Sequence, residues 1–318
     1  MKTVASMDAR SFQAAAWAPL AAGAALIAFG MLSDPYLLRL ATEILLIGTA
    51  VMSLNLVTGQ GGLVSLCHGA LFGAAAYAAA LLAQHAGVSL AATLAVGIVT
   101  GGLLALIVAL ISLRSSGLFF LVATLIAGQL LWEIAFQWRE ATGGADGLRG
   151  FTASAGSRPW WAQPVWLYAL AAAWACASLA LLRRYLRQPA GIALQALRDQ
   201  PLRMQALGYS TGRIRAQAFA VSGGVAGGAG ALYPFINLYI SPESVHWSFS
   251  ASLLIMGVIG GIRSLAGAYC GAAIYLLIQT YLSSYTDRWQ LLIGLLFVLT
   301  VLFMPEGIAH GMRRGRRS

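Results

Sequence analysis

The residues best suited to specific chemistry in this sequence form one basic group. The stretch LRDQPLRMQALGYSTGRIRAQAF, residues 197–219, places Arg198, Asp199, Arg203, Arg213 and Arg215 between two apolar runs. Guanidinium and carboxylate groups make strong charge-assisted hydrogen bonds to a partner surface. We therefore interpret the stretch as a docking element for another protein. The alternative is a surface-bound segment without a partner.

Residue patterns for catalysis are missing. The four histidines are scattered, and no HExxH or paired-carboxylate motif occurs. The three cysteines lie far apart without CxxC spacing, which favours packing over metal binding or a disulfide. The only lysine is Lys2, so the chain cannot contain a GxxxxGK[ST] phosphate-binding loop. We expect no enzyme activity and no cofactor bound by this chain.

Two carboxylates fall within apolar segments. Glu43 follows Arg39 by one helical turn, which predicts an interfacial ion pair. Glu133 is near the end of an apolar segment, beside Trp132 and Trp138, and is expected to reach the membrane interface. A proton relay through either carboxylate is the functional alternative.

The elements that position these residues are membrane helices. Only 9% of the residues are charged and mean hydropathy is +0.76, as in a polytopic membrane protein. We predict an all-α transmembrane helical bundle, one permease domain over residues 1–318, with some glycine-broken or half-helices. Ten apolar segments are expected, at 16–32, 37–57, 62–84, 89–112, 116–136, 164–182, 216–238, 248–262, 265–284 and 289–304.

The arginines orient the bundle. With the N-terminus inside, fifteen of the 20 basic residues lie in inner loops and five in outer ones. This asymmetry predicts that both termini are cytoplasmic. It also explains the net charge of +10 by contact with the lipid bilayer and cytoplasm, so no nucleic acid partner is expected. Residues 187–213 form a cytoplasmic segment, and residues 305–318 a cytoplasmic basic tail.

Prolines and glycines divide the cytoplasmic segment into short helices. Pro201 is expected in the first turn of a new helix, because proline cannot continue the preceding one. Gly208 is expected to end that helix in a left-handed conformation. Elsewhere, GxxxG pairs predict close helix contacts, at Gly69/Gly73, Gly97/Gly101, Gly223/Gly227, Gly224/Gly228, Gly257/Gly261 and Gly267/Gly271.

Polar residues inside apolar segments are candidates for a substrate path. They are Ser65, His68, Tyr77 and Gln129. For His68 the alternative is a packing histidine with a fixed tautomer. If His68 lines the path, its replacement by Ala reduces uptake more than assembly.

Several blocks, in order, resemble the LivM-type permeases of branched-chain amino acid ABC importers. Residues 54–82, LNLVTGQGGLVSLCHGALFGAAAYAAALL, are similar to LNLLxGxxGLxSLGHAAFFGxGAYxAALL of that family. Residues 196–199 (ALRD), 206–208 (ALG) and 218–233 resemble its cytoplasmic loop and following helix. TGGADGL at 142–148, SPESVHWSFSASLLIMGVIGGIRSLAGAYCGA at 241–272 and LFMPEGI at 302–308 resemble further blocks.

The resemblance implies a permease subunit in the bacterial inner membrane. Its partners would be a second, LivH-like permease subunit, two cytoplasmic ATPase subunits that bind ATP and Mg, and a periplasmic substrate-binding protein. Segment 192–208 would hold the coupling helix that sits in an ATPase groove, with Arg198, Asp199, Arg203, Ala206, Leu207 and Gly208 as ATPase-coupling residues.

Other functions compete with this interpretation. Within the superfamily, the substrate could be urea, a short amide or another small polar metabolite rather than branched-chain or related small amino acids. A gradient-driven secondary transporter would need an intramembrane carboxylate or a repeat of two halves, and neither is clear in the sequence. A membrane enzyme is the third and weakest interpretation.

The topology yields a direct test. Reporter domains fused at Gln13 and at His310 are expected to be cytoplasmic, because the basic residues accumulate on that side, and a fusion near Asp146 is expected to be periplasmic. A periplasmic signal from the C-terminal fusion would show that the number of spans is wrong.

Overall fold

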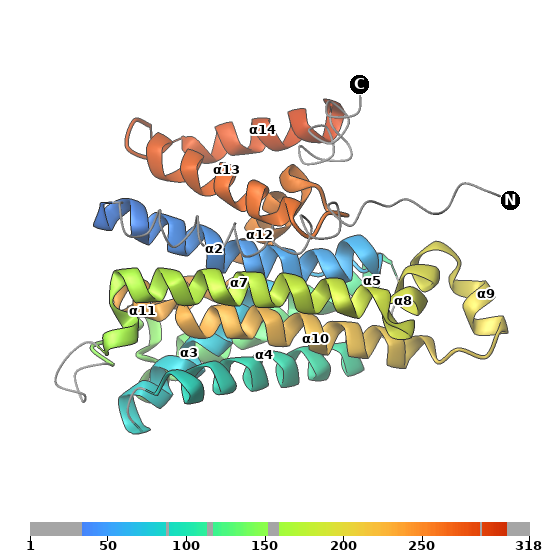
Figure 1. Ribbon diagram of the computed structural model, residues 1–318, viewed down its shortest axis with the longest axis horizontal. Helices are drawn as coiled ribbons and strands as arrows, with labels where there is room; N and C mark the ends of the chain where they lie inside the picture. Colours follow the sequence, from blue (N-terminus) through green and yellow to red (C-terminus); the bar gives the residue numbers. More distant parts are fainter. Residues whose placement is uncertain (1–33, 87–88, 113–116, 152–158, 287, 304–318) are drawn as a thin grey trace, which may run out of the picture.

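The protein is a bundle of helices with one short two-stranded ribbon (Figure 1). The computed structural model describes residues 34–86, 89–112, 117–151, 159–286 and 288–303. Its main helices are α2 (Pro35–Asn55), continued by the π-helical turn η1 (Leu56–Gln60), α3 (His68–Ala86), α4 (Leu90–Ser112), α5 (Leu118–Gln137), α7 (Pro164–Arg187), α10 (Thr211–Leu232), α12 (Trp247–Gly260), α13 (Gly267–Leu282) and α14 (Trp289–Phe303). The predicted all-α polytopic fold is confirmed.

Five of the described helical segments are long and apolar enough to cross a membrane: Pro35–Gln60, Leu90–Ser112, Leu118–Gln137, Pro164–Arg187 and Thr211–Asn237. Helices α12, α13 and α14 are apolar but only 14, 16 and 15 residues long. At 1.5 Å per residue they span about 21–24 Å, which is less than the roughly 30 Å hydrocarbon core. The chain therefore contains the short helices that its glycine content predicted.

Nine of the ten predicted segments coincide with a helix, and segment 16–32 lies outside the described residues. Two boundaries differ clearly. Residues 61–67 precede α3 as irregular chain, because Gly62 takes a left-handed φ of 69°. The predicted span 216–238 begins earlier, at Thr211, and breaks after Leu232, where Pro234 starts the short helix α11 (Pro234–Asn237).

Glycines bring α4 and α10 into backbone contact. A Cβ added to Gly97 would lie 2.6 Å from the Gly227 carbonyl oxygen, and one added to Gly227 would overlap the Gly97 carbonyl oxygen. Gly101 and Gly223 face each other in the same way. The predicted Gly97/Gly101 and Gly223/Gly227 pairs thus form one interface, in which small residues let the backbones approach.

Helix α2 lies at the centre of the bundle. Most of its residues from Leu46 to Asn55 are fully buried, and it packs against α7, α10, α12 and α13. Polar contacts fix it to the C-terminal part of the chain. Thr49 Oγ1 lies 3.1 Å from Tyr269 Oη, and Asn55 Nδ2 donates to the Ser264 carbonyl at 3.2 Å.

The chain between α12 and α13, residues 261–266, is irregular and closely packed against η1. Gln60 Nε2 donates to the Arg263 carbonyl at 2.7 Å. Gly59 approaches the Ile262 carbonyl so closely that a Cβ there would overlap it. Gly59 is therefore required by this contact.

Helices α8 (Pro189–Asp199) and α9 (Pro201–Ala206) lie at the right in Figure 1. At the opposite end of the bundle, two segments far apart in sequence pair as a ribbon. Strand β1 (Leu148–Arg149) pairs antiparallel with β2 (Tyr239–Ile240), with Leu148 opposite Ile240. The TGGADGL turn before β1 has left-handed φ values at Gly143, Gly144 and Gly147. The ribbon thereby joins the TGGADGL turn, residues 142–148, to the chain just before the SPES sequence, residues 241–244.

The glycine interface predicts a contrast between neighbouring glycines of α10. Gly227→Ala is expected to destabilise the bundle by about 1–3 kcal/mol, because its methyl group would overlap the α4 backbone. Gly224→Ala is the control, since its Cβ meets nothing closer than 3.6 Å. Thermal unfolding of the purified chain in detergent micelles measures both, and equal midpoints would refute the close contact.

Candidate substrate cavity and coupling surface

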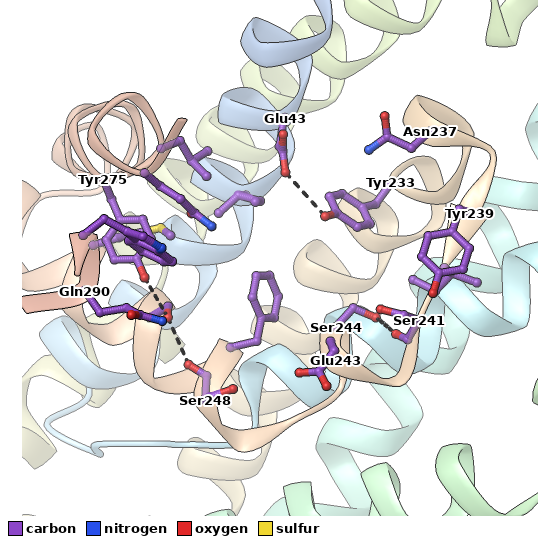
Figure 2. A pocket seen from close by; sticks show the side chains of 18 residues that line it. Glu43, Tyr233, Asn237, Tyr239, Ser241, Glu243, Ser244, Ser248, Tyr275 and Gln290 are labelled. Atoms are coloured by element: carbon purple, nitrogen blue, oxygen red, sulfur yellow. Dashed lines mark hydrogen bonds between the residues drawn. The ribbon is translucent and has the colours of Figure 1, made fainter. Parts of the chain in front are cut away.

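A cavity of about 580 Å³ opens at the end of the bundle that carries the β1–β2 ribbon (Figure 2). Its walls come from α2, from Tyr233 directly after α10, from residues 237–244, and from α12, α13 and α14. Its volume lies within the range of small-molecule sites. The polar lining consists of Glu43, Tyr233, Asn237, Tyr239, Ser241, Glu243, Ser244, Ser248, Ser252, Tyr275, Gln279 and Gln290.

The cavity runs from an exposed mouth to a buried floor. Glu243 and Gln290 at the mouth are exposed, whereas Met256 and Tyr275 are buried. Tyr275 Oη donates to Ser252 Oγ at 3.0 Å across the α12–α13 interface. Apolar surface comes from Ile47 and Met256. The arrangement suits a small molecule with both polar and aliphatic parts.

Glu43 is positioned in the cavity by α2, and the predicted ion pair with Arg39 is wrong. Among the described residues, the ion pair within 4.0 Å is Arg198–Asp199. Glu43 instead accepts a hydrogen bond of 3.4 Å from Tyr233 Oη, as Figure 2 shows. Arg39 is exposed, whereas Glu43 is turned into the bundle. A long arginine side chain one turn nearer the helix end can reach water instead.

The predicted path residues do not line this cavity. Ser65 lies in the irregular segment before α3, and His68 begins α3; both are fully buried. Tyr77 in α3 is also buried, and Gln129 in α5 is half-buried. The side-chain oxygens Tyr77 Oη and Gln129 Oε1 are buried without a hydrogen-bond partner in the described part of the chain.

His68 is held by hydrogen bonds at both ring nitrogens. Its Nδ1 lies 3.1 Å from Ser65 Oγ and its Nε2 2.8 Å from Ser222 Oγ. Ser222 Oγ donates its proton to the Ser53 carbonyl at 2.6 Å, so it accepts from Nε2–H. Nδ1 of the neutral ring is then the acceptor for Ser65. These contacts favour the packing alternative for His68.

The second candidate site is the basic segment, which forms α8 (Pro189–Asp199) and α9 (Pro201–Ala206). The predicted helix start at Pro201 is confirmed, and Gly208 has the predicted left-handed conformation, with φ 81°. Leu194 and Leu197 are buried against the bundle. Leu202 and Leu207 are 79% and 64% exposed, beside exposed Arg203. We call the exposed part of residues 199–208 the coupling surface.

One arginine fastens this segment to the central helix. Arg198 Nη1 donates to the Gly59 carbonyl in η1 at 2.8 Å, and its Nη2 lies 2.8 Å from Asp199 Oδ1. Arg198 is mostly covered, whereas the Asp199 side chain is 62% exposed. Among the residues predicted to contact an ATPase, Arg198 thus turns its guanidinium toward the bundle, whereas Asp199 and Arg203 face outward.

These features define a class of protein: a multi-pass membrane permease with a polar cavity at one end and a basic surface at the other. The family described as branched-chain amino acid transport system / permease component matches residues 36–301. The chain belongs to this family.

Individual proteins that the chain resembles are also permeases of branched-chain amino acid transport systems. The chain is 27% identical over 280 residues to the high-affinity branched-chain amino acid transport system permease proteins LivM of Escherichia coli K12 and Salmonella typhimurium LT2. The match covers 81% of this chain and 66% of either LivM protein, just under two thirds of their length. A probable LivH permease of Methanocaldococcus jannaschii is 30% identical over 127 residues, which is 37% of this chain and 40% of that protein. No solved structure matches.

The cavity residues could not be found from sequence, with one exception. Glu43 stood out as a carboxylate in an apolar segment, but its neighbour Arg39 suggested the wrong partner. Nothing in the local sequence marks Tyr233, Ser252 and Tyr275 as cavity residues, because the cavity joins them from the end of α10, from α12 and from α13.

The hydrogen bonds of His68 predict the phenotype of His68→Ala. The substitution leaves Ser65 and Ser222 without their shared partner, so stability is expected to fall by about 1–3 kcal/mol. Uptake per assembled complex is expected to stay normal. The measurements are membrane level, thermal unfolding and uptake per molecule, with exposed His85→Ala as the control. Normal membrane levels with lost uptake would place His68 in the substrate path.

Proposed function

We propose that this chain is the permease subunit of an ATP-driven importer in the bacterial inner membrane, carrying branched-chain or related small amino acids. The observation that best supports this proposal is the coupling surface. It presents exposed leucines and charged groups to a partner, while Arg198 joins the segment that bears it to the central helix. An exposed amphipathic helix of this kind fits a groove on another protein.

The partners follow from this proposal. Two cytoplasmic ATPase subunits bind ATP and Mg and receive the coupling surface. A second, LivH-like permease subunit completes the membrane part, and a periplasmic binding protein delivers substrate at the cavity end. The arginine distribution supports this orientation: eight described arginines lie near the coupling surface, at positions 183, 184, 187, 198, 203, 213, 215 and 263. Both termini are then cytoplasmic.

Rival substrates and energy sources make different demands on the molecule. A permease for urea or short amides needs no site for a charged group. A gradient-driven transporter needs no ATPase, and its uptake follows an ion gradient in vesicles that lack ATP. The family and the exposed coupling surface favour the ATP-driven importer.

The coupling surface is tested by two substitutions outside the spans. Gly208→Val forces a branched residue into a left-handed conformation, and Asp199→Arg removes the ion pair to Arg198 and reverses an exposed charge. Both variants are expected to reach the membrane. In the purified complex in lipid, with binding protein and substrate, stimulated ATP hydrolysis and uptake are expected to fall about tenfold.

The control is Gly212→Val in the first turn of α10. Neither Gly208 nor Gly212 has atoms within 4 Å of an added Cβ, but only Gly208 has a positive φ. The control therefore separates backbone strain from added bulk and is expected to retain hydrolysis. Full stimulated hydrolysis and uptake in both test variants would reduce the segment to a surface helix without a coupling role.

A further inference from the structure

The cavity at the ribbon end has an unbalanced charge. Its charged lining residues are Glu43 and Glu243, and no Arg, Lys or His lines it in the described part of the chain. Glu243 lies at the exposed mouth, whereas Glu43 lies deeper, on the central helix. In Figure 2 the Glu43 carboxylate and the Tyr233 hydroxyl point toward each other on one side of the cavity.

A carboxylate in this position is costly unless a cation meets it. Intramembrane acids are rare, and those that occur face cavities and bind substrates, ions or protons. The hydroxyl of Tyr233, at 3.4 Å, supplies a single long hydrogen bond to one carboxylate oxygen. Glu43 thus keeps acceptor capacity for further donors, and an ammonium group carries three.

The other walls of the cavity differ from the Glu43 side. Gln279 of α13 offers a side-chain amide, which can donate to a carboxylate. The hydroxyls of Tyr275 and Ser252 already donate hydrogen bonds within the protein, Tyr275 Oη to Ser252 Oγ and Ser252 Oγ to the Ser248 carbonyl, each at 3.0 Å. Met256 adds an aliphatic surface. One side of the cavity accepts hydrogen bonds from a cation, and the other combines a neutral donor with apolar contact.

We propose that Glu43 is the ammonium-binding residue of a low-affinity site for zwitterionic α-amino acids with aliphatic side chains. The ammonium group contacts the Glu43 carboxylate, and the substrate carboxylate lies toward the Gln279 side-chain amide of α13. This inference rests on the proposed function and specifies its substrate class. Urea and simple amides lack the cation that the site requires.

Binding to the purified membrane complex, without binding protein or ATP, tests the site directly. The probe is radiolabelled L-leucine in equilibrium dialysis. Isopentylamine, which keeps the ammonium and the aliphatic chain, is expected to compete. 4-Methylpentanoate, which keeps the carboxylate and the chain, is expected to compete at least tenfold more weakly. Glu43→Gln is expected to weaken leucine binding about tenfold or more, the scale of one lost charge-assisted bond.

Two variants guard against a general loss of folding. Glu133→Gln neutralises a carboxylate of α5 outside the cavity, where Glu133 accepts a hydrogen bond from Gln137, and is expected to bind leucine normally. Tyr233→Phe removes the hydroxyl on Glu43 but keeps the carboxylate, and is expected to retain binding within about threefold, since only one long hydrogen bond of 3.4 Å is lost and the group that contacts the ammonium stays. Unchanged binding in Glu43→Gln, equal competition by both analogues, or no saturable binding in the wild type overturns the proposal.

A transport experiment separates this inference from the proposed function. Wild-type complex in vesicles, with binding protein, is tested for leucine uptake with ATP and with a proton gradient alone. ATP-driven uptake that Glu43→Gln leaves intact supports the importer and overturns the ammonium site. Uptake driven by the proton gradient without ATP, and abolished in Glu43→Gln, overturns the importer and makes Glu43 a proton carrier instead.

Discussion

The hydrogen bond from Arg198 to the Gly59 carbonyl joins the exposed segment α8–α9 to the central helix of the bundle. On one side of it is the amphipathic segment with its exposed leucines, and on the other is the central helix α2 with its π-helical end. Sixteen residues separate Gly59 from Glu43 along this helix, or roughly 24 Å at 1.5 Å per residue. A buried helix of this length physically connects the exposed surface at one end of the bundle, where we propose that a partner docks, with the polar cavity at the other.

The bundle around α2 depends on small residues more than on large ones. Lipid tails are as apolar as leucine, so helices in a membrane gain little from burying leucine against leucine. Between α4 and α10 the chain uses glycines to bring two backbones together, and between α10 and α7 it places Gly228 against the ring of Trp174. Many large apolar side chains of α4 and α5, such as Leu103, Ile111 and Phe119, are exposed and suit a lipid-facing surface.

The sequence predicted what depends on local spacing. The apolar segments, the Pro201 helix start, the Gly208 left-handed turn and the Gly97/Gly101 and Gly223/Gly227 pairs are all set within a few residues, whereas Gly224 of the predicted Gly224/Gly228 pair makes no close contact. The cavity and the polar contacts were not predictable in this way. Glu43 pairs with Tyr233, 190 residues away, and not with Arg39 one turn earlier. His68 looked like a path residue because it is polar in an apolar run, yet its contact with Ser222 crosses 154 residues.

The irregular chain at 261–266 limits how the protein can move. Its backbone carbonyls at Arg263 and Ser264 are satisfied by the side-chain amides of Gln60 and Asn55, in place of a regular helix. Arg263 itself is exposed, so water can reach this turn, and its contacts with α2 and η1 are what hold it in place. Any motion that separated α2 from the α12–α13 turn would break both amide–carbonyl hydrogen bonds and open the close contact between Gly59 and the Ile262 carbonyl. These three contacts act against a hinge at this point and favour one that lies elsewhere in the bundle.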